Sequence, residues 1–118
     1  MPEIIPAVMA ETREELIEKL LAFSAFAPSA HVDFMDSSFV RPISWPFKPD
    51  QELGHIETTM LLEAHLMIHD QAFATQLPSA GFSRILCHLE AFPGITETRT
   101  TIAACREAGA KEVGISIK

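Results

Sequence analysis

Ala30-His31-Val32-Asp33-Phe34-Met35 is the stretch from which the fold can be worked out. It follows a chain-breaking proline, Pro28, and it is rich in apolar residues, so it is predicted to be a β-strand. Similar runs lie at residues 3–9, 60–68, 82–89 and 112–117. One run therefore begins about every 25 to 30 residues, which is the period of repeated βαβ units with parallel strands and right-handed crossovers.

Helices are predicted between the strands. Thr12 and Glu15 have the spacing of a capping box, so a helix should begin there, and Asp70 is a candidate cap for another that Pro78 and Gly81 would end. Residues 36–49 are rich in proline and are predicted to form a loop anchored by one buried side chain, either Trp45 or Phe47. The other helices are expected at residues 50–56 and 98–108.

Five strands and four helices in 118 residues fit a single α/β domain, a (βα)4-plus-one-strand unit over residues 1–118. Two architectures share this pattern. One is an open doubly wound sheet, and the other is half of a TIM-type (β/α)8 barrel, which in full needs roughly 250 residues. A Gly-x-Gly-x-x-Gly stretch and a Walker loop are both absent from the sequence, so nucleotide-binding versions of the open sheet are disfavoured.

Composition narrows the functional classes. Apolar residues make up 47% of the chain, which is enough for a core and argues against disorder. The formal charge is −7 without a basic cluster, so a nucleic-acid partner is not expected. We also expect no membrane span and no signal peptide. Cys87 and Cys105 lack metal-motif spacing and are interpreted as free thiols, which favours a cytoplasmic protein.

Polar side chains interrupt two strands that should be almost wholly apolar in a parallel sheet. Alternation along a strand places two sets of side chains each on one face: His31, Asp33 and Met35, and Glu63, His65 and Met67. Binding sites of α/β folds lie at the carboxyl ends of the strands. Two imidazoles and a carboxylate form a plausible ligand set for a divalent transition metal.

A structural interpretation competes with the metal site. A single histidine on a strand is more often a hydrogen-bonded core residue than a ligand, and a buried aspartate often caps a loop. The combination favours a site, because a buried carboxylate beside two imidazoles is costly without a shared partner. His88 and Glu90 share a face of the fourth predicted strand and are weaker candidates.

The motifs resemble one enzyme family. His31-Val32-Asp33-Phe34-Met35-Asp36, with Phe39-Val40 and Pro42, is similar to the second-strand signature of ribulose-phosphate 3-epimerases. Ala64-His65-Leu66-Met67 and Cys87-His88-Leu89-Glu90-Ala91 resemble the third and fourth strands, and residues 109–118 resemble the fifth. The first strand, Ile5-Pro6-Ala7-Val8-Met9, matches more loosely. The resemblance covers the N-terminal half of the family's barrel.

The resemblance implies an isomerase of pentose phosphate carbohydrate metabolism. Such an enzyme inverts the carbon next to the ketone of a pentulose 5-phosphate with one divalent metal, zinc or iron(II). By this resemblance His31, Asp33 and His65 would be metal ligands, and Asp33 would also be a catalytic acid/base. The remaining implied contacts are to the substrate, from His65, Met35, Met67 and Ala7.

Several residues of the sequence differ from those usual in the family. Ala7 stands where the family usually has a serine that binds substrate, Glu63 stands for a common aspartate, and Ser37-Ser38 stands for a Gly-His pair. The family's fourth ligand, second catalytic aspartate and phosphate loops belong to later strands, with no match in residues 1–118. We therefore expect one chain to be incomplete as an enzyme and to pair with a second copy or a complementary half-barrel.

The sheet of a half-barrel leaves one face and two edges uncovered. We expect the face that points inward to be apolar, and we expect the open edges of the sheet to recruit a partner. The alternative function is a non-catalytic half-barrel that binds a metal or acts as an interaction module.

Overall fold

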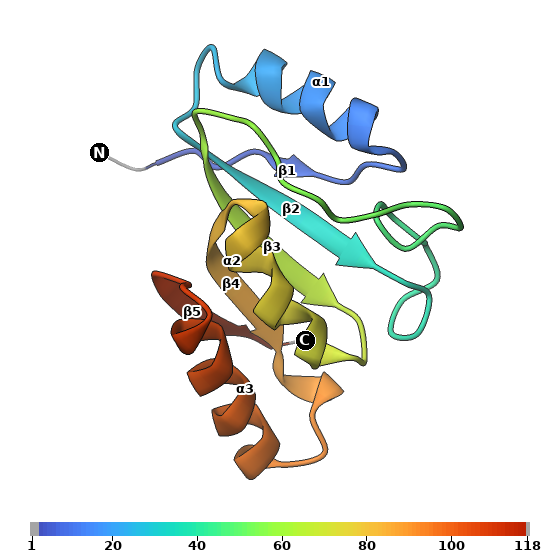
Figure 1. Cartoon of the computed structure of the whole chain (residues 1–118), viewed down its shortest axis with the longest axis vertical. Coiled ribbons are helices and arrows are strands. Elements are labelled where there is room, and N and C mark those ends of the chain that lie inside the picture. Colours follow the sequence, from blue (N-terminus) through green and yellow to red (C-terminus); the bar gives the residue numbers. More distant parts are fainter. Residues whose placement is uncertain (1–2, 118) are drawn as a thin grey trace.

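A computed structural model describes residues 3–117. Its centre is one sheet of five strands in the order β1-β2-β3-β4-β5 (Figure 1). All four neighbouring pairs are parallel, as predicted. The strands are β1 (Ala7–Val8), β2 (Ser29–Met35), β3 (Leu61–Met67), β4 (Phe82–His88) and β5 (Glu112–Ser116).

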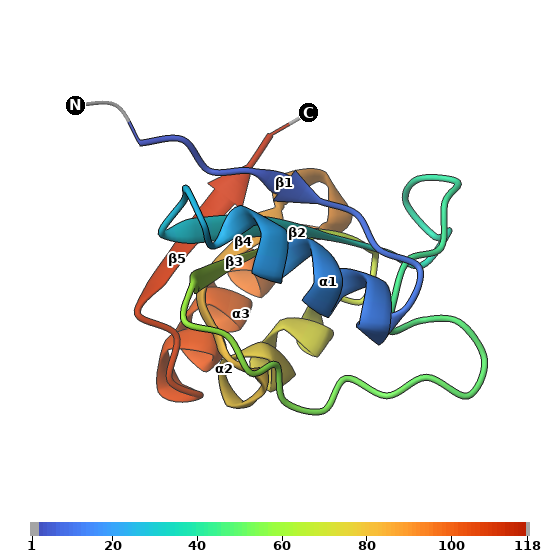
Figure 2. The same cartoon turned by 90° about the horizontal axis from the view of Figure 1, so that it is seen from above.

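The α-helices and the first 3-10 helix cover one face of this sheet, and a second 3-10 helix follows β4. They are α1 (Arg13–Phe23), the 3-10 helix η1 (Gln71–Gln76), α2 (Leu77–Ala80), the 3-10 helix η2 (Leu89–Ala91) and α3 (Ile95–Glu107). Strands in chain order joined by right-handed crossovers place every helix on the same side, and Figure 2 shows α1, α2 and α3 there. A doubly wound sheet needs helices on both faces. The fold is therefore the βα arrangement of a half TIM barrel.

The hydrophobic core lies between the helices and the outer face of the sheet. Every second residue of β2 and β3 contributes to it, because alternate side chains of a strand point to the same face. These residues are almost fully buried: Ala30, Val32, Phe34, Leu62, Ala64 and Leu66. Leu16 and Leu20, one turn apart on α1, pack into the same core. The Thr12 side chain accepts a hydrogen bond from the Glu15 backbone N–H, so the predicted cap of α1 is confirmed.

The helix predicted at residues 50–56 is wrong, and an irregular segment joins β2 to β3. Asp50 and Gly54 have φ angles of 65° and 60°, which no right-handed helix accommodates. The Arg13 guanidinium donates hydrogen bonds to the carbonyls of Leu53 and His55, which a helix would use internally. The loop before this segment has the expected buried anchor, Trp45, which is 2% exposed.

Three smaller predictions also need correction. The first strand spans only Ala7–Val8 rather than residues 3–9. The helix predicted after Asp70 begins as a 3-10 helix, and the Asp70 side chain makes no capping hydrogen bond. Pro78 lies in the first turn of α2, where its missing N–H is tolerated, and Gly81 ends the helix with φ 112°.

The inner face of the sheet is polar, so the predicted apolar face is wrong. Register aligns His31 with Glu63 and Asp33 with His65 across β2 and β3. Between Leu62 and Glu63 the pairing with β4 shifts by one residue, so that Glu63 pairs with Arg84. A single extra residue of this kind is a β-bulge, and it turns the rest of the strand to the other face. Arg84, Leu86 and His88 thus share the inner face with the site residues.

Two other expectations concern the thiols and the membrane. Cys87 and Cys105 are free and buried in the core, on the side of the sheet away from the polar residues. Over residues 3–117, no helix is long and apolar enough to cross a membrane.

Candidate metal centre

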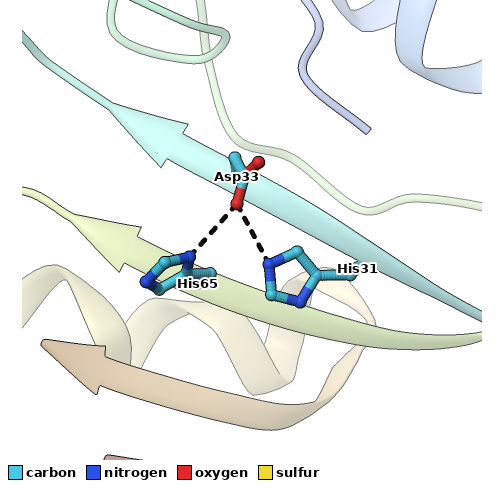
Figure 3. Close-up of side chains that lie close together, drawn as sticks. All are labelled: His31, Asp33 and His65. Atoms are coloured by element: carbon cyan, nitrogen blue, oxygen red, sulfur yellow. Dashed lines mark hydrogen bonds and ion pairs between the residues drawn. The ribbon is translucent and has the colours of Figure 1, made fainter. Parts of the chain in front are cut away.

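His31, Asp33 and His65 converge on the inner face of the sheet (Figure 3). Asp33 lies between the two imidazoles: its Oδ1 is 3.0 Å from His31 Nε2 and 3.2 Å from His65 Nδ1. One ligand atom from each residue lies within 4.8 Å of the other two. The predicted convergence is confirmed. It follows from the parallel register, which sets Asp33 directly beside His65, and from the two-residue repeat that puts His31 on the same face.

Glu63 supports this group from one side. Its Oε2 is 2.6 Å from His31 Nδ1, so the two nitrogens of His31 face two carboxylates. The hydrogen bond to Asp33 raises the pKa of His31 to about 8; burial opposes this rise, and the hydrogen bond to Glu63 adds to it. Without a metal, the imidazole therefore carries both protons at neutral pH and donates to both carboxylates.

The Asp33 carboxylate is held in its ionised form. Burial alone would raise its pKa, but hydrogen bonds from His31 and His65 outweigh burial and lower the pKa to about 2. The side chain is 23% exposed, and those of His31 and His65 are 19% and 17% exposed. The group is thus ionised, partly shielded from water and reachable from the open face of the sheet.

The donor set fits a divalent transition metal. Ligand atoms of a tetrahedral zinc site with bonds of about 2.0–2.1 Å lie about 3.3–3.4 Å apart, and the two short separations here are 3.0 and 3.2 Å. Two carboxylates, Asp33 and Glu63, balance the charge of a dication. A half-buried cation is tolerated only with such compensation. The ligand nitrogens would be His31 Nε2 and His65 Nδ1, the atoms that face Asp33.

The other predicted site residues lie around this group. Met35 and Met67 are paired with each other in register, two residues after Asp33 and His65, at the carboxyl ends of β2 and β3. Met35 is buried and Met67 is half-buried. Ala7 pairs with His31 on the other side of β2, and it is exposed. All three therefore border the polar group.

His88 and Glu90 are closer to the site than the sequence indicated. His88 Nδ1 is 3.4 Å from His65 Nε2, and His88 Nε2 is 2.9 Å from Glu90 Oε1. The sequence placed both on one face of the fourth strand, which is wrong for Glu90, because β4 ends at His88 and Glu90 lies in η2. The sequence also could not align His88 with His65, because that alignment depends on the bulge in β4. The sequence analysis also missed the contact of Glu63 with His31. Alternation along neighbouring parallel strands puts both side chains on the same face, so this contact could have been predicted.

Comparison with known families agrees with this geometry. The model of the ribulose-phosphate 3 epimerase family matches residues 1–118, and the chain belongs to that family. No individual curated protein matches the chain. The family is a TIM barrel, in keeping with the one-sided βα sheet described above.

Proposed function

We propose that this chain provides the metal-binding and proton-abstracting half of a ribulose-phosphate 3-epimerase. The observation that carries the proposal is the convergence of His31, Asp33 and His65 in a chain of that family. His31, Asp33 and His65 would hold zinc or iron(II), both of which accept mixed imidazole and carboxylate ligands. The substrate would be a pentulose 5-phosphate.

Asp33 is the proposed acid/base. Epimerisation begins when a base removes the proton on the carbon next to the ketone. Asp33 is ionised at neutral pH and faces the open side of the sheet, so it can accept that proton. A bound dication would supply positive charge to stabilise the negative charge that develops on the substrate oxygens. His65 would contact these oxygens, and Met35, Met67 and Ala7 would form the wall of the substrate pocket.

Inversion also needs a proton donor on the opposite side of the substrate carbon. Asp33 and Glu63 lie on one sheet face, and Glu63 is bonded to His31, so neither is placed to donate from the opposite side. We infer that a single copy of residues 1–118 does not supply this donor and the phosphate cradle by itself. A second copy in a homodimer, or a complementary half-barrel, would provide them across the open edges of β1 and β5.

Deuterium exchange separates proton abstraction from inversion. The zinc-loaded or iron(II)-loaded monomer, its mass verified by light scattering, is incubated with ribulose 5-phosphate in deuterated water, and NMR follows both the C3 proton and the C3 epimer. We expect loss of the C3 proton without matching epimer formation, because one carboxylate can remove a proton and return a deuteron on the same side. Equal rates of exchange and epimerisation would contradict the proposed incompleteness.

Two variants make the assignment specific. Asp33→Asn should abolish exchange, whereas Asp70→Asn, an exposed carboxylate of the η1 N-terminus, should leave it unchanged. Zinc binding without any exchange in the wild-type protein would overturn catalysis and favour the alternative, a non-catalytic metal-binding half-barrel.

A further inference from the structure

The imidazole of His88 lies next to His65 on the inner face, on the side of His65 that points away from Asp33. The bulge in β4 turns His88 toward β3, and the side chain is 7% exposed. The Phe39 ring packs on it edge to face, with centroids 4.5 Å apart. Phe39 belongs to the loop after β2. In this loop the Ser38 hydroxyl accepts a hydrogen bond from the backbone N–H of His69, two residues after the end of β3. His88 is therefore held in a shielded position.

Without a metal, His65 Nδ1 donates a hydrogen bond to the ionised Asp33 carboxylate, whereas a bound metal would require a different set of protons. His65 Nδ1 faces Asp33, and a nitrogen that binds a metal must offer its lone pair. His65 then carries its proton on Nε2, which donates to His88 Nδ1 at 3.4 Å. His88 Nε2 in turn lies 2.9 Å from Glu90 Oε1, so the Glu90 carboxylate is an ion-pair partner for the His88 imidazole. With a metal bound, His65 would therefore direct Nδ1 to the metal and donate from Nε2, and His88 would accept that hydrogen bond on Nδ1.

The other histidine of the centre is supported in the same way. His31 directs Nε2 to Asp33 and Nδ1 to the carboxylate of Glu63. Hydrogen bonds of this kind to the outer nitrogen fix the tautomer and the ring orientation of metal-binding histidines. Each imidazole of the centre therefore has an acceptor beside the nitrogen that points away from Asp33. The acceptor is Glu63 for His31 and His88 for His65.

We propose that His88 and Glu90 are positioning residues that hold His65 with Nδ1 directed at the metal position. The inference rests on the proposed metal centre, since it assigns the ligand nitrogen of that centre. His88 and Glu90 would not touch the metal. They would select the Nε2-protonated form of His65 and restrict rotation of its ring.

Zinc affinity and histidine tautomers test the inference without relying on activity. Zn²⁺ binding to the whole chain is measured by competition with a chromogenic chelator. His88→Leu should weaken zinc binding about 10- to 100-fold, the usual effect of removing such a support. His88→Asn should restore most of the affinity, because its Oδ1 can accept at the place of Nδ1. His69→Leu is the matched control, since its exposed ring also contacts Phe39.

A second readout follows the proton itself. In ¹⁵N NMR of the zinc-loaded wild-type protein, His65 should show a metal-bound Nδ1 and a protonated Nε2 that exchanges slowly with water. His88→Leu should accelerate that exchange or mix the tautomers, which a merely structural role of His88 would not do. Glu90→Gln should shift affinity in the same direction but less, because its amide oxygen still accepts a hydrogen bond.

The outcomes separate the two proposals. A wild-type chain that does not bind zinc would overturn the metal centre itself. Zinc binding that is equal in wild type and His88→Leu, with an unchanged His65 spectrum, would overturn only the positioning role. If His88→Leu does not fold, His88→Asn and His88→Gln decide. Asn places an oxygen at the Nδ1 position and Gln at the Nε2 position, so equal affinities would contradict the inference.

Discussion

Phe34→Ala should remove much of the stability of the fold, although Phe34 is next to Asp33 in the sequence. The two side chains point to opposite faces of β2. Phe34 is fully buried, and its ring centroid lies 5.4–6.4 Å from four other aromatic rings. The substitution therefore tests the division of β2 into a core face and a site face.

The expected cost can be worked from these contacts. Burial of a phenylalanine side chain contributes about 1.5–3 kcal/mol, and each favourable aromatic pair adds about 0.5–1.5 kcal/mol. A cavity among rings held by two strands, a helix and a loop cannot collapse fully. We expect a loss of about 4–5 kcal/mol, at the upper end of the range for Phe→Ala. That is a large part of the roughly 5–15 kcal/mol typical of a domain.

Urea unfolding followed by circular dichroism measures the free energy of unfolding. Phe26→Ala is the matched control, because Phe26 is 68% exposed and its ring packs against Phe23, with ring centroids 5.8 Å apart. Its loss should stay below about 1 kcal/mol. A loss under about 2 kcal/mol for Phe34→Ala, or equal losses for both variants, would refute the assignment of the core face.

Three further changes test other parts of the structure. Thr12→Ala should cost about 1 kcal/mol in thermal or chemical unfolding, because the Glu15 N–H loses its capping acceptor; an unchanged free energy would contradict the cap. Gly81→Ala should destabilise by about 1–3 kcal/mol, since φ is 112° and the new Cβ would lie 3.2 Å from the Ile56 carbonyl oxygen. Gly94→Ala should cost less, because its φ of −170° suits alanine and the change affects just the N-cap position of α3. His65→Ala should lower zinc affinity by more than the 10- to 100-fold that loss of a supporting residue causes, while the metal-free fold survives; unchanged metal content would show that His65 is not a ligand.

Sequence patterns predicted most of the sheet because its strands are short apolar runs between turn residues. The strands that became β2 to β5 lie within about one residue of their predicted ends. Residues 50–56 could not be predicted, because their backbone is set from outside. Arg13, about 40 residues earlier, binds the carbonyls of Leu53 and His55, and Asp50 adopts a left-handed conformation.

The candidate site was predictable where alternation alone decides it. His31 and Asp33 share a face by spacing, and His65 joins them once neighbouring strands are parallel and in register. His88 required more information. One extra residue in β4 sets its face, and a bulge depends on pairing between strands rather than on a residue type. The support for His65 therefore emerged only from the three-dimensional arrangement.

Anomalous X-ray diffraction at the zinc edge from zinc-loaded crystals tests the central claim most directly. The account predicts one strong peak per chain, bonded at about 2.0–2.2 Å to His31 Nε2, Asp33 Oδ1 and His65 Nδ1. A peak bound by other residues, or zinc-loaded crystals with no peak between β2 and β3, would contradict it.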